Sequence, residues 1–137
     1  MKRLMYALML LAAVTCGVAQ AQLDPEEMYT KASALTKLTA AVQAFVRYDD
    51  PSDSLSEREI LRLATKHDPD LLSGMSPYAL KVRRQERNAS VLMCTADGTQ
   101  GLLEDVGCTA PLDKHLWQSP SAEPCTFTLR ISEICRQ

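Results

Sequence analysis

The side chains with the clearest chemical potential in this chain are its cysteines. The sequence contains five cysteines, and the first, Cys16, lies inside an apolar N-terminal leader. The other four form an even set, which is typical of a disulfide framework in an exported domain. We therefore expect disulfides, and no free thiolate nucleophile, at Cys94, Cys108, Cys125 and Cys135.

The spacing of these cysteines limits how they can pair. If residues 125–131 form an extended strand, the two ends of that strand lie about 20 Å apart. The Cα atoms of bridged cysteines lie within about 7 Å of each other. A bond between Cys125 and Cys135 would therefore require the chain to reverse sharply. We expect two long-range bridges that join Cys94 and Cys108 to these two C-terminal cysteines, and the spacing leaves both such pairings open.

Neither histidine stands in a pattern typical of a catalytic or metal site. His67 and His115 are the two histidines of the chain, and each lies beside carboxylates rather than beside a second imidazole. Zinc would need three or four convergent ligands, and no Gly-x-Ser-x-Gly motif marks a nucleophilic serine. We therefore predict no cofactor, no metal and no catalytic residue. The alternative is a small exported hydrolase whose site forms only in the folded chain, with His115, Asp113 and Asp97 as its first candidates.

One run of basic residues, Lys81, Arg83, Arg84 and Arg87, is a possible partner surface. On a strand, successive side chains point to opposite faces. Lys81, Arg83 and Arg87 would then share the outer face, with Arg84 on the other. Such a stripe could dock an acidic partner or an anionic surface. The pattern favours instead a charged, solvated strand edge that discourages aggregation between sheets.

The N-terminal residues have the pattern of a cleavable signal peptide. A basic start precedes an apolar run over residues 4–14, and Ala-Gln-Ala at 19–21 is a small-x-small cleavage site. The apolar run is too short to span a bilayer as a stable helix. We expect residues 1–21 to be removed, which leaves 22–137 as a single small disulfide-stabilised domain in the periplasm or outside the cell. The alternative is a lipoprotein anchored through Cys16.

The first half of the sequence predicts two helices, over about 24–48 and about 56–67. The first begins with Asp24 as its N-cap, followed by a proline, and apolar side chains then recur at helical spacing. Ser56 and Glu59 have the spacing of a capping box at the start of the second. A proline follows each helix and prevents its continuation.

The second half predicts a small antiparallel sheet. Alternating apolar and polar residues indicate strands over about 78–84 and 125–131, and a short apolar run indicates another over about 90–96. Arg87-Asn88 could turn the chain between the first two strands to form a hairpin, and residues 99–106 are expected to form a short helical turn. Helices followed by such strands define an α+β domain, with the helices packed on the sheet and the two disulfides fastening it.

The charge balance narrows the class of partner. The chain carries 15 Lys and Arg against 17 Asp and Glu. A mildly acidic domain lacks the dense positive face that nucleic-acid binding needs, and no second apolar stretch could span a membrane. We therefore expect a non-enzymatic exported protein that binds another envelope or secreted protein in bacteria, either as an inhibitor or immunity-type protein or as an accessory factor for secretion or assembly.

Overall fold

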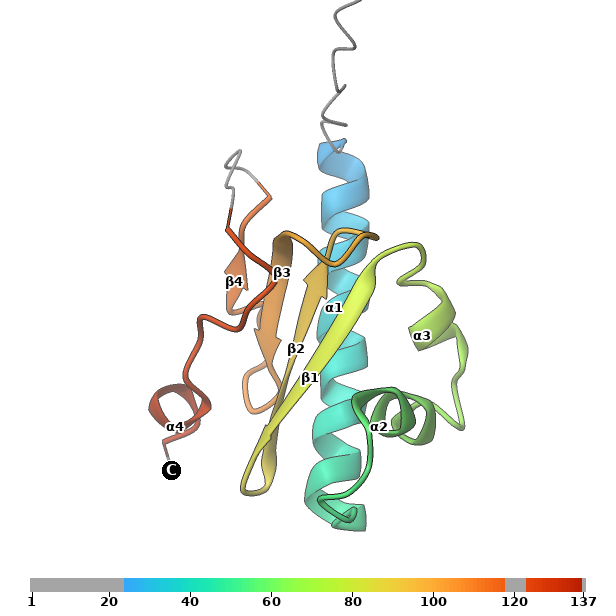
Figure 1. Ribbon diagram of the computed structural model, residues 1–137, viewed down its shortest axis with the longest axis vertical. Helices are drawn as coiled ribbons and strands as arrows, with labels where there is room; N and C mark the ends of the chain where they lie inside the picture. Colours follow the sequence, from blue (N-terminus) through green and yellow to red (C-terminus); the bar gives the residue numbers. More distant parts are fainter. Residues whose placement is uncertain (1–23, 118–122, 137) are drawn as a thin grey trace, which may run out of the picture.

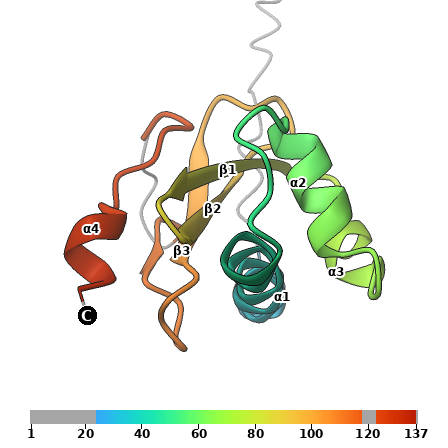
Figure 2. The same cartoon turned by 90° about the horizontal axis from the view of Figure 1, so that it is seen from below.

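The computed structural model describes residues 24–117 and 123–136, and these form an α+β domain, as predicted. A long helix, α1 (Pro25–Ala44), crosses one face of a four-stranded antiparallel sheet (Figure 1). The strands lie in the order β1 (Ala79–Gln85), β2 (Asn88–Cys94), β3 (Gly101–Val106) and β4 (Lys114–His115). Seen from below, two short helices, α2 (Glu57–Ala64) and α3 (Asp70–Ser73), lie to one side of α1, and the C-terminal helix α4 (Ile131–Ile134) lies on the other (Figure 2). The predicted signal peptide and Cys16 lie outside the described residues.

Helix α1 (Pro25–Ala44) begins where the sequence predicts. The side chain of Asp24 accepts a hydrogen bond from the Glu26 amide, and Pro25 occupies the first turn. The helix continues as a π-helical turn, η1 (Phe45–Asp49), and stops at Asp50, which adopts a left-handed conformation. The inner face of α1 is buried against the sheet through Leu35, Leu38 and Val42.

Helix α2 (Glu57–Ala64) carries the predicted capping box and is shorter than expected. The Ser56 hydroxyl accepts from the Glu59 amide, and the Glu59 carboxylate accepts from the Ser56 amide. The helix ends at Ala64, and a separate four-residue helix, α3 (Asp70–Ser73), follows. These two helices cover the side of α1 next to β1.

The first two strands, β1 (Ala79–Gln85) and β2 (Asn88–Cys94), confirm the predicted hairpin. The third strand is β3 (Gly101–Val106), and a two-residue strand, β4 (Lys114–His115), completes the sheet. The prediction of a helical turn over 99–106 is therefore wrong. Gly98, at φ 73°, turns the chain after β2, and the following residues pair with β2 instead of coiling.

The predicted strand over 125–131 is also wrong. Apart from an isolated bridge between Gln100 and Pro124, this segment does not pair with the sheet, and it ends in helix α4 (Ile131–Ile134). Its backbone groups bond to side chains that project from the sheet, so no strand partner is required. Glu104 accepts from the amides of Thr128 and Leu129 at 3.0–3.2 Å.

The sheet is buried on both faces. On the α1 side, Val91, Met93 and Leu103 pack with the apolar face of the helix. On the other side, Leu92 packs with the buried Cys94 and Cys125 under the C-terminal segment. In the described part of the chain, no helix is both long and apolar enough to cross a membrane.

Candidate functional site

Two disulfides fix the C-terminal segment to the sheet, and both join an earlier cysteine to a C-terminal one, as predicted. Cys94 bonds to Cys125 at a Cα–Cα distance of 5.7 Å, and this bridge is buried. Cys108 bonds to Cys135 at 5.8 Å, and both of these residues are partly exposed. The structure thus selects one of the two pairings that the sequence left open.

The predicted basic surface is divided between the two faces of β1, and its side chains bond to the protein's own backbone. Lys81 and Arg83 lie on the face away from α1, where they donate to the carbonyls of Cys125 and Leu129. Arg83 also stacks on the ring of Phe127, 4.7 Å from its centroid. These two cations hold the C-terminal segment in place.

The other two basic residues bond on the opposite side. Arg84 donates to the carbonyls of Pro51 and Ser52, both at 3.1 Å. Arg87 does not continue the outer stripe, because it lies in the turn after β1 and donates to the Arg47 carbonyl at the end of α1. All four cations therefore make internal contacts, and the structure does not gather them into one stripe.

The three candidates for a hydrolase site do not come together. Asp97 lies in the turn before β3, where it accepts from Thr95 and Thr99. Asp113 lies near the other end of β3 and accepts from the Val106 amide. A six-residue strand separates these two carboxylates, about 17 Å at 3.3 Å per residue. His115, on β4, is exposed.

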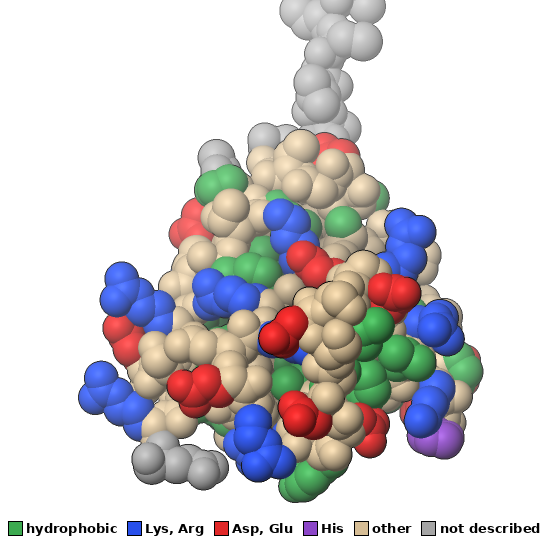
Figure 3. Space-filling model, turned by 60° about the horizontal axis from the view of Figure 1, so that its bottom comes forward, with side chains coloured by type: hydrophobic (Ala, Val, Ile, Leu, Met, Phe, Trp, Pro, Cys, Tyr) green, Lys and Arg blue, Asp and Glu red, His purple; other side chains and the backbone are tan. Residues whose placement is uncertain are grey.

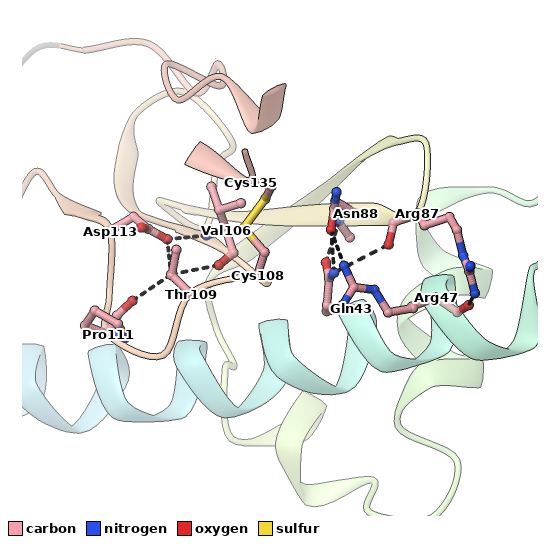
Figure 4. Close-up of a disulfide and its surroundings, with 11 residues drawn as sticks. Gln43, Arg47, Arg87, Asn88, Val106, Cys108, Thr109, Pro111, Asp113 and Cys135 are labelled. Carbon is pink, nitrogen blue, oxygen red and sulfur yellow. Dashed lines mark hydrogen bonds between the residues drawn. A yellow bond between two sulfur atoms is a disulfide. The ribbon is translucent and has the colours of Figure 1, made fainter. Parts of the chain in front are cut away.

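A polar network ties the β1–β2 hairpin to α1. The amide nitrogen of Gln43 donates to the Asn88 side chain at 2.8 Å, and its oxygen accepts from the Ala89 amide at 2.7 Å. Arg47 reaches the same Asn88 oxygen. Figure 4 shows Gln43 of α1 and Arg47 of η1 rising towards Asn88, with the Cys108–Cys135 disulfide on the neighbouring segment. A Cβ added at Gly107 would meet the Gln43 Cβ at 2.5 Å, so this segment also lies directly on α1.

Two carboxylates, the buried Asp105 and the partly exposed Asp113, face each other beside this network. Asp105 is 2% exposed and projects from β3 towards Thr39 of α1. Burial, followed by the hydrogen bond and the like charge of Asp113, raises the pKa of Asp105 to about 7. A carboxyl with this pKa holds its proton much of the time at neutral pH. Sequence reasoning missed the pair, because the two residues are brought together only by the fold.

A groove lies between α2, α3 and the start of β1, with a volume of about 450 Å³. Its apolar walls include Leu61, Leu72, Met75 and Leu80, and Glu57 and Arg58 stand beside them. On the face drawn in Figure 3, exposed hydrophobic side chains gather among acidic and basic ones.

Tyr78 closes one end of this groove and is itself held in place. Its hydroxyl donates to Glu27 at 2.8 Å, and Trp117 packs edge-on at a centroid distance of 5.9 Å. Burial, with help from the Glu27 hydrogen bond and charge, raises the pKa of Tyr78 to about 12. The phenol therefore stays protonated and serves as a fixed wall of the groove rather than as a base.

The edge of strand β1 that points away from β2 borders the groove at Leu80. The Val82 amide points away from β2, because it donates to the Glu57 carboxylate at 2.9 Å. Alternate amides of a strand point the same way, so the Leu80 amide also points outward, beside the groove. Arg84 and residues 51–53 cover the far end of this edge, whereas the Leu80 end borders the apolar walls.

A second hollow, of about 550 Å³, lies between α1 and the α2–α3 connection, where Tyr29 is 70% exposed. No strand edge reaches it. Among the described residues, no group of three or more histidine, cysteine or acidic side chains could hold a metal ion.

The fold and these surfaces define a small α+β domain with two disulfides. Comparisons with protein-family models, with curated proteins and with solved structures gave no match.

Proposed function

We propose that this chain is an exported, non-enzymatic protein that acts by binding another protein of the bacterial envelope or its surroundings, through the groove between α2, α3 and β1. Two disulfides in a domain of this size support export, because such bonds persist in oxidising compartments. The sequence of the leader supports the same destination.

The observation that carries this proposal is the contact between a groove with apolar and polar walls and the Leu80 end of the β1 edge. An extended peptide can pair its backbone with a strand edge while its side chains enter an adjoining pocket. Here Leu80 offers the outward amide, and Leu61, Leu72 and Met75 offer the pocket. The occupant that fits is an extended segment of a partner protein with a large apolar side chain.

The charge at the groove adds a second requirement for the partner. Glu57 is already engaged by the Val82 amide. Arg58 is exposed, and none of the three ion pairs within residues 24–117 and 123–136 involves it. A carboxylate next to the apolar anchor of the partner would pair with this guanidinium and would speed the encounter.

A matched pair of variants tests this surface. The purified, oxidised protein is immobilised, envelope and culture-medium proteins are passed over it, and the captured protein is identified and its affinity measured. Arg58→Glu should weaken capture at least tenfold. Arg62→Glu, on the same helix and also exposed but absent from the groove lining, should leave it unchanged.

The pattern of capture by the two variants decides whether the groove is the binding surface. Capture that Arg58→Glu removes and Arg62→Glu retains supports the groove. Capture that both variants retain, or that neither the unmodified protein nor the variants show, contradicts it. Lost capture with Arg62→Glu alone would place the interface on another face of α2.

Export is tested separately by mass spectrometry of the mature N-terminus. We expect a chain that begins at Gln22. An acylated Cys16 would instead establish the lipoprotein alternative, and an intact leader on material from the cytosol would contradict export.

A further inference from the structure

Asp105, which is buried, and Asp113, which is partly exposed, face each other with too few donors to satisfy every carboxylate oxygen. One oxygen of Asp105, Oδ1, is buried with no hydrogen-bond partner among the described residues. Asp113 accepts from the Val106 amide at 2.7 Å and from the Thr109 hydroxyl at 2.8 Å, both through Oδ2. A proton between the two side chains would give Asp105 a partner and would remove the repulsion.

The groups that surround Asp105 supply little positive charge. From α1 it meets the Thr39 hydroxyl, which also donates its single proton to the Leu35 carbonyl at an oxygen–oxygen distance of 2.8 Å, and the Asp113 backbone supplies a further hydrogen bond. The next turn of α1 offers only the neutral Gln43. From β2 the residue opposite is Val91, and β4 contributes the exposed His115, which pairs with Leu103. None of the three ion pairs of the described chain involves either carboxylate.

Asp113 joins the end of the segment 107–113 to the sheet, and the Gly107 amide joins its start through the Ala89 carbonyl of β2. Asp113 accepts from Val106, the last residue of β3, and from Thr109 within the segment (Figure 4). Gly107 lies against Gln43 of α1, and the next residue, Cys108, is bridged to Cys135. The segment therefore rests on α1 at Gly107, is joined to β3 through the carboxylate pair, and stays covalently attached through the disulfide.

We propose that Asp105 and Asp113 share one proton, and that loss of this proton releases the segment 107–113 from α1 and β3. Two carboxylates facing each other in a buried site cannot both ionise without repulsion. The segment is closed while the proton is present and opens as the pH rises. The disulfide keeps the opening local and reversible. An exported domain would thereby respond to the pH of its surroundings.

Burial and the neighbouring charge set the range of this response. They raise the pKa of Asp105 to about 7. If the open segment returns Asp105 to its ordinary value of 3.8, linkage predicts that the open fraction rises about tenfold between pH 6 and pH 8.

The first test uses the unmodified protein. Carboxyl carbon resonances of labelled aspartates are followed by NMR between pH 3 and 9, with hydrogen exchange of the Val106 amide measured in parallel. One aspartate of the pair should titrate near neutral pH. The protection of the Val106 amide, corrected for the intrinsic exchange rate, should fall about tenfold between pH 6 and pH 8. Titration of every aspartate below about pH 5, or constant protection, would overturn the proposal.

Two variants assign the transition to the pair. Asp105→Asn keeps a donor facing Asp113 and carries no titrating proton, so the Val106 protection should become independent of pH. His115→Gln controls for imidazole, because histidine titrates near the same pH, and it should leave the transition in place. A transition that survives in Asp105→Asn, or that disappears in His115→Gln, would refute a shared proton as its cause. The NMR titration of the unmodified protein decides the matter if Asp105→Asn does not fold.

Discussion

The raised pKa of Asp105 predicts that the stability of the whole domain falls as the pH rises towards 7. Its pKa rises from 3.8 to about 7 on folding, because burial and then Asp113 disfavour the charged form. Between these values the folded protein binds a proton that the unfolded chain has lost. The free energy of unfolding must therefore fall as the pH rises from about 4 to about 7, and then level off.

The magnitude follows from the size of the shift. A change of about 3 pKa units corresponds to about 4 kcal/mol, at about 1.36 kcal/mol per unit. Asp105 is 2% exposed, so solvent screens this effect only weakly. The loss is large beside a typical domain stability of about 5–15 kcal/mol. In the steep part of the curve the expected slope is about −1.4 kcal/mol per pH unit.

Other shifted carboxylates act in a lower pH range and with the opposite sign. Hydrogen bonds from Ser56 lower the pKa of Glu59, and those from Thr95 and Thr99 lower that of Asp97. These groups stabilise the fold above their unfolded pKa values, and that contribution is lost as the pH falls through the folded ones. Between about pH 5 and pH 7, Asp105 is therefore the shifted carboxylate that changes the free energy of unfolding.

Urea unfolding at half-unit steps from pH 4.5 to 8.5 measures this curve. In Asp105→Asn the downward slope should vanish, and the variant should be the more stable protein at pH 8. Asp53→Asn removes an exposed carboxylate, 3.7 Å from Arg84, and should retain the slope of the unmodified protein. A stability that is flat or rising over pH 5 to 6.5, or identical curves for the unmodified protein and Asp105→Asn, would refute the reasoning.

Two further substitutions test how segments are held on the domain, by urea unfolding at constant pH. Gly107→Ala should lower the free energy of unfolding by about 1–3 kcal/mol, because the new methyl group meets Gln43 at 2.5 Å. Gly98→Ala has open space around it, so it introduces only backbone strain and should lower the free energy of unfolding by about 1 kcal/mol. A larger loss at Gly98 than at Gly107 would contradict this packing. Glu104→Gln should cost about 2–4 kcal/mol, because one carboxylate accepts from two amides and a hydroxyl of the C-terminal segment. Glu123→Gln breaks only a surface pair and should cost less than about 1 kcal/mol, and equal losses for the two glutamates would rule out the buried role.

The sequence predicts those elements whose signals are local. The capping pair Ser56–Glu59 and the N-cap Asp24 mark helix starts through side-chain-to-backbone bonds within one turn. The first hairpin is predictable because Leu80 and Val82 alternate with polar residues on a strand that is only partly covered. Local patterns of this kind require no knowledge of what packs on the other side.

The elements that sequence reasoning misplaces are those whose neighbours in the fold leave no local pattern in the sequence. Strand β3 is buried on both faces, so Leu103 and Glu104 are equally inaccessible and no alternation remains to be read. The segment after Cys125 does alternate, but the Glu104 carboxylate and the cations of β1 take the backbone groups that a neighbouring strand would use. The Asp105–Asp113 pair needs the same long-range information, so a single sequence gives no sign of it.

The groove and the carboxylate pair lie far enough apart to act independently. Leu80 pairs with Met93, which pairs with Leu103, so two strand spacings separate β1 from β3. Asp105 lies two residues further along β3, which places it about 12 Å from Leu80 across the sheet. Effects of sites more than about 10 Å apart usually add. The affinity of a partner captured through Arg58 should therefore be the same in Asp105→Asn and in the unmodified protein at pH 6 and at pH 8. A difference of more than about threefold, present only at pH 8, would show instead that the segment 107–113 communicates with the groove through the shared core.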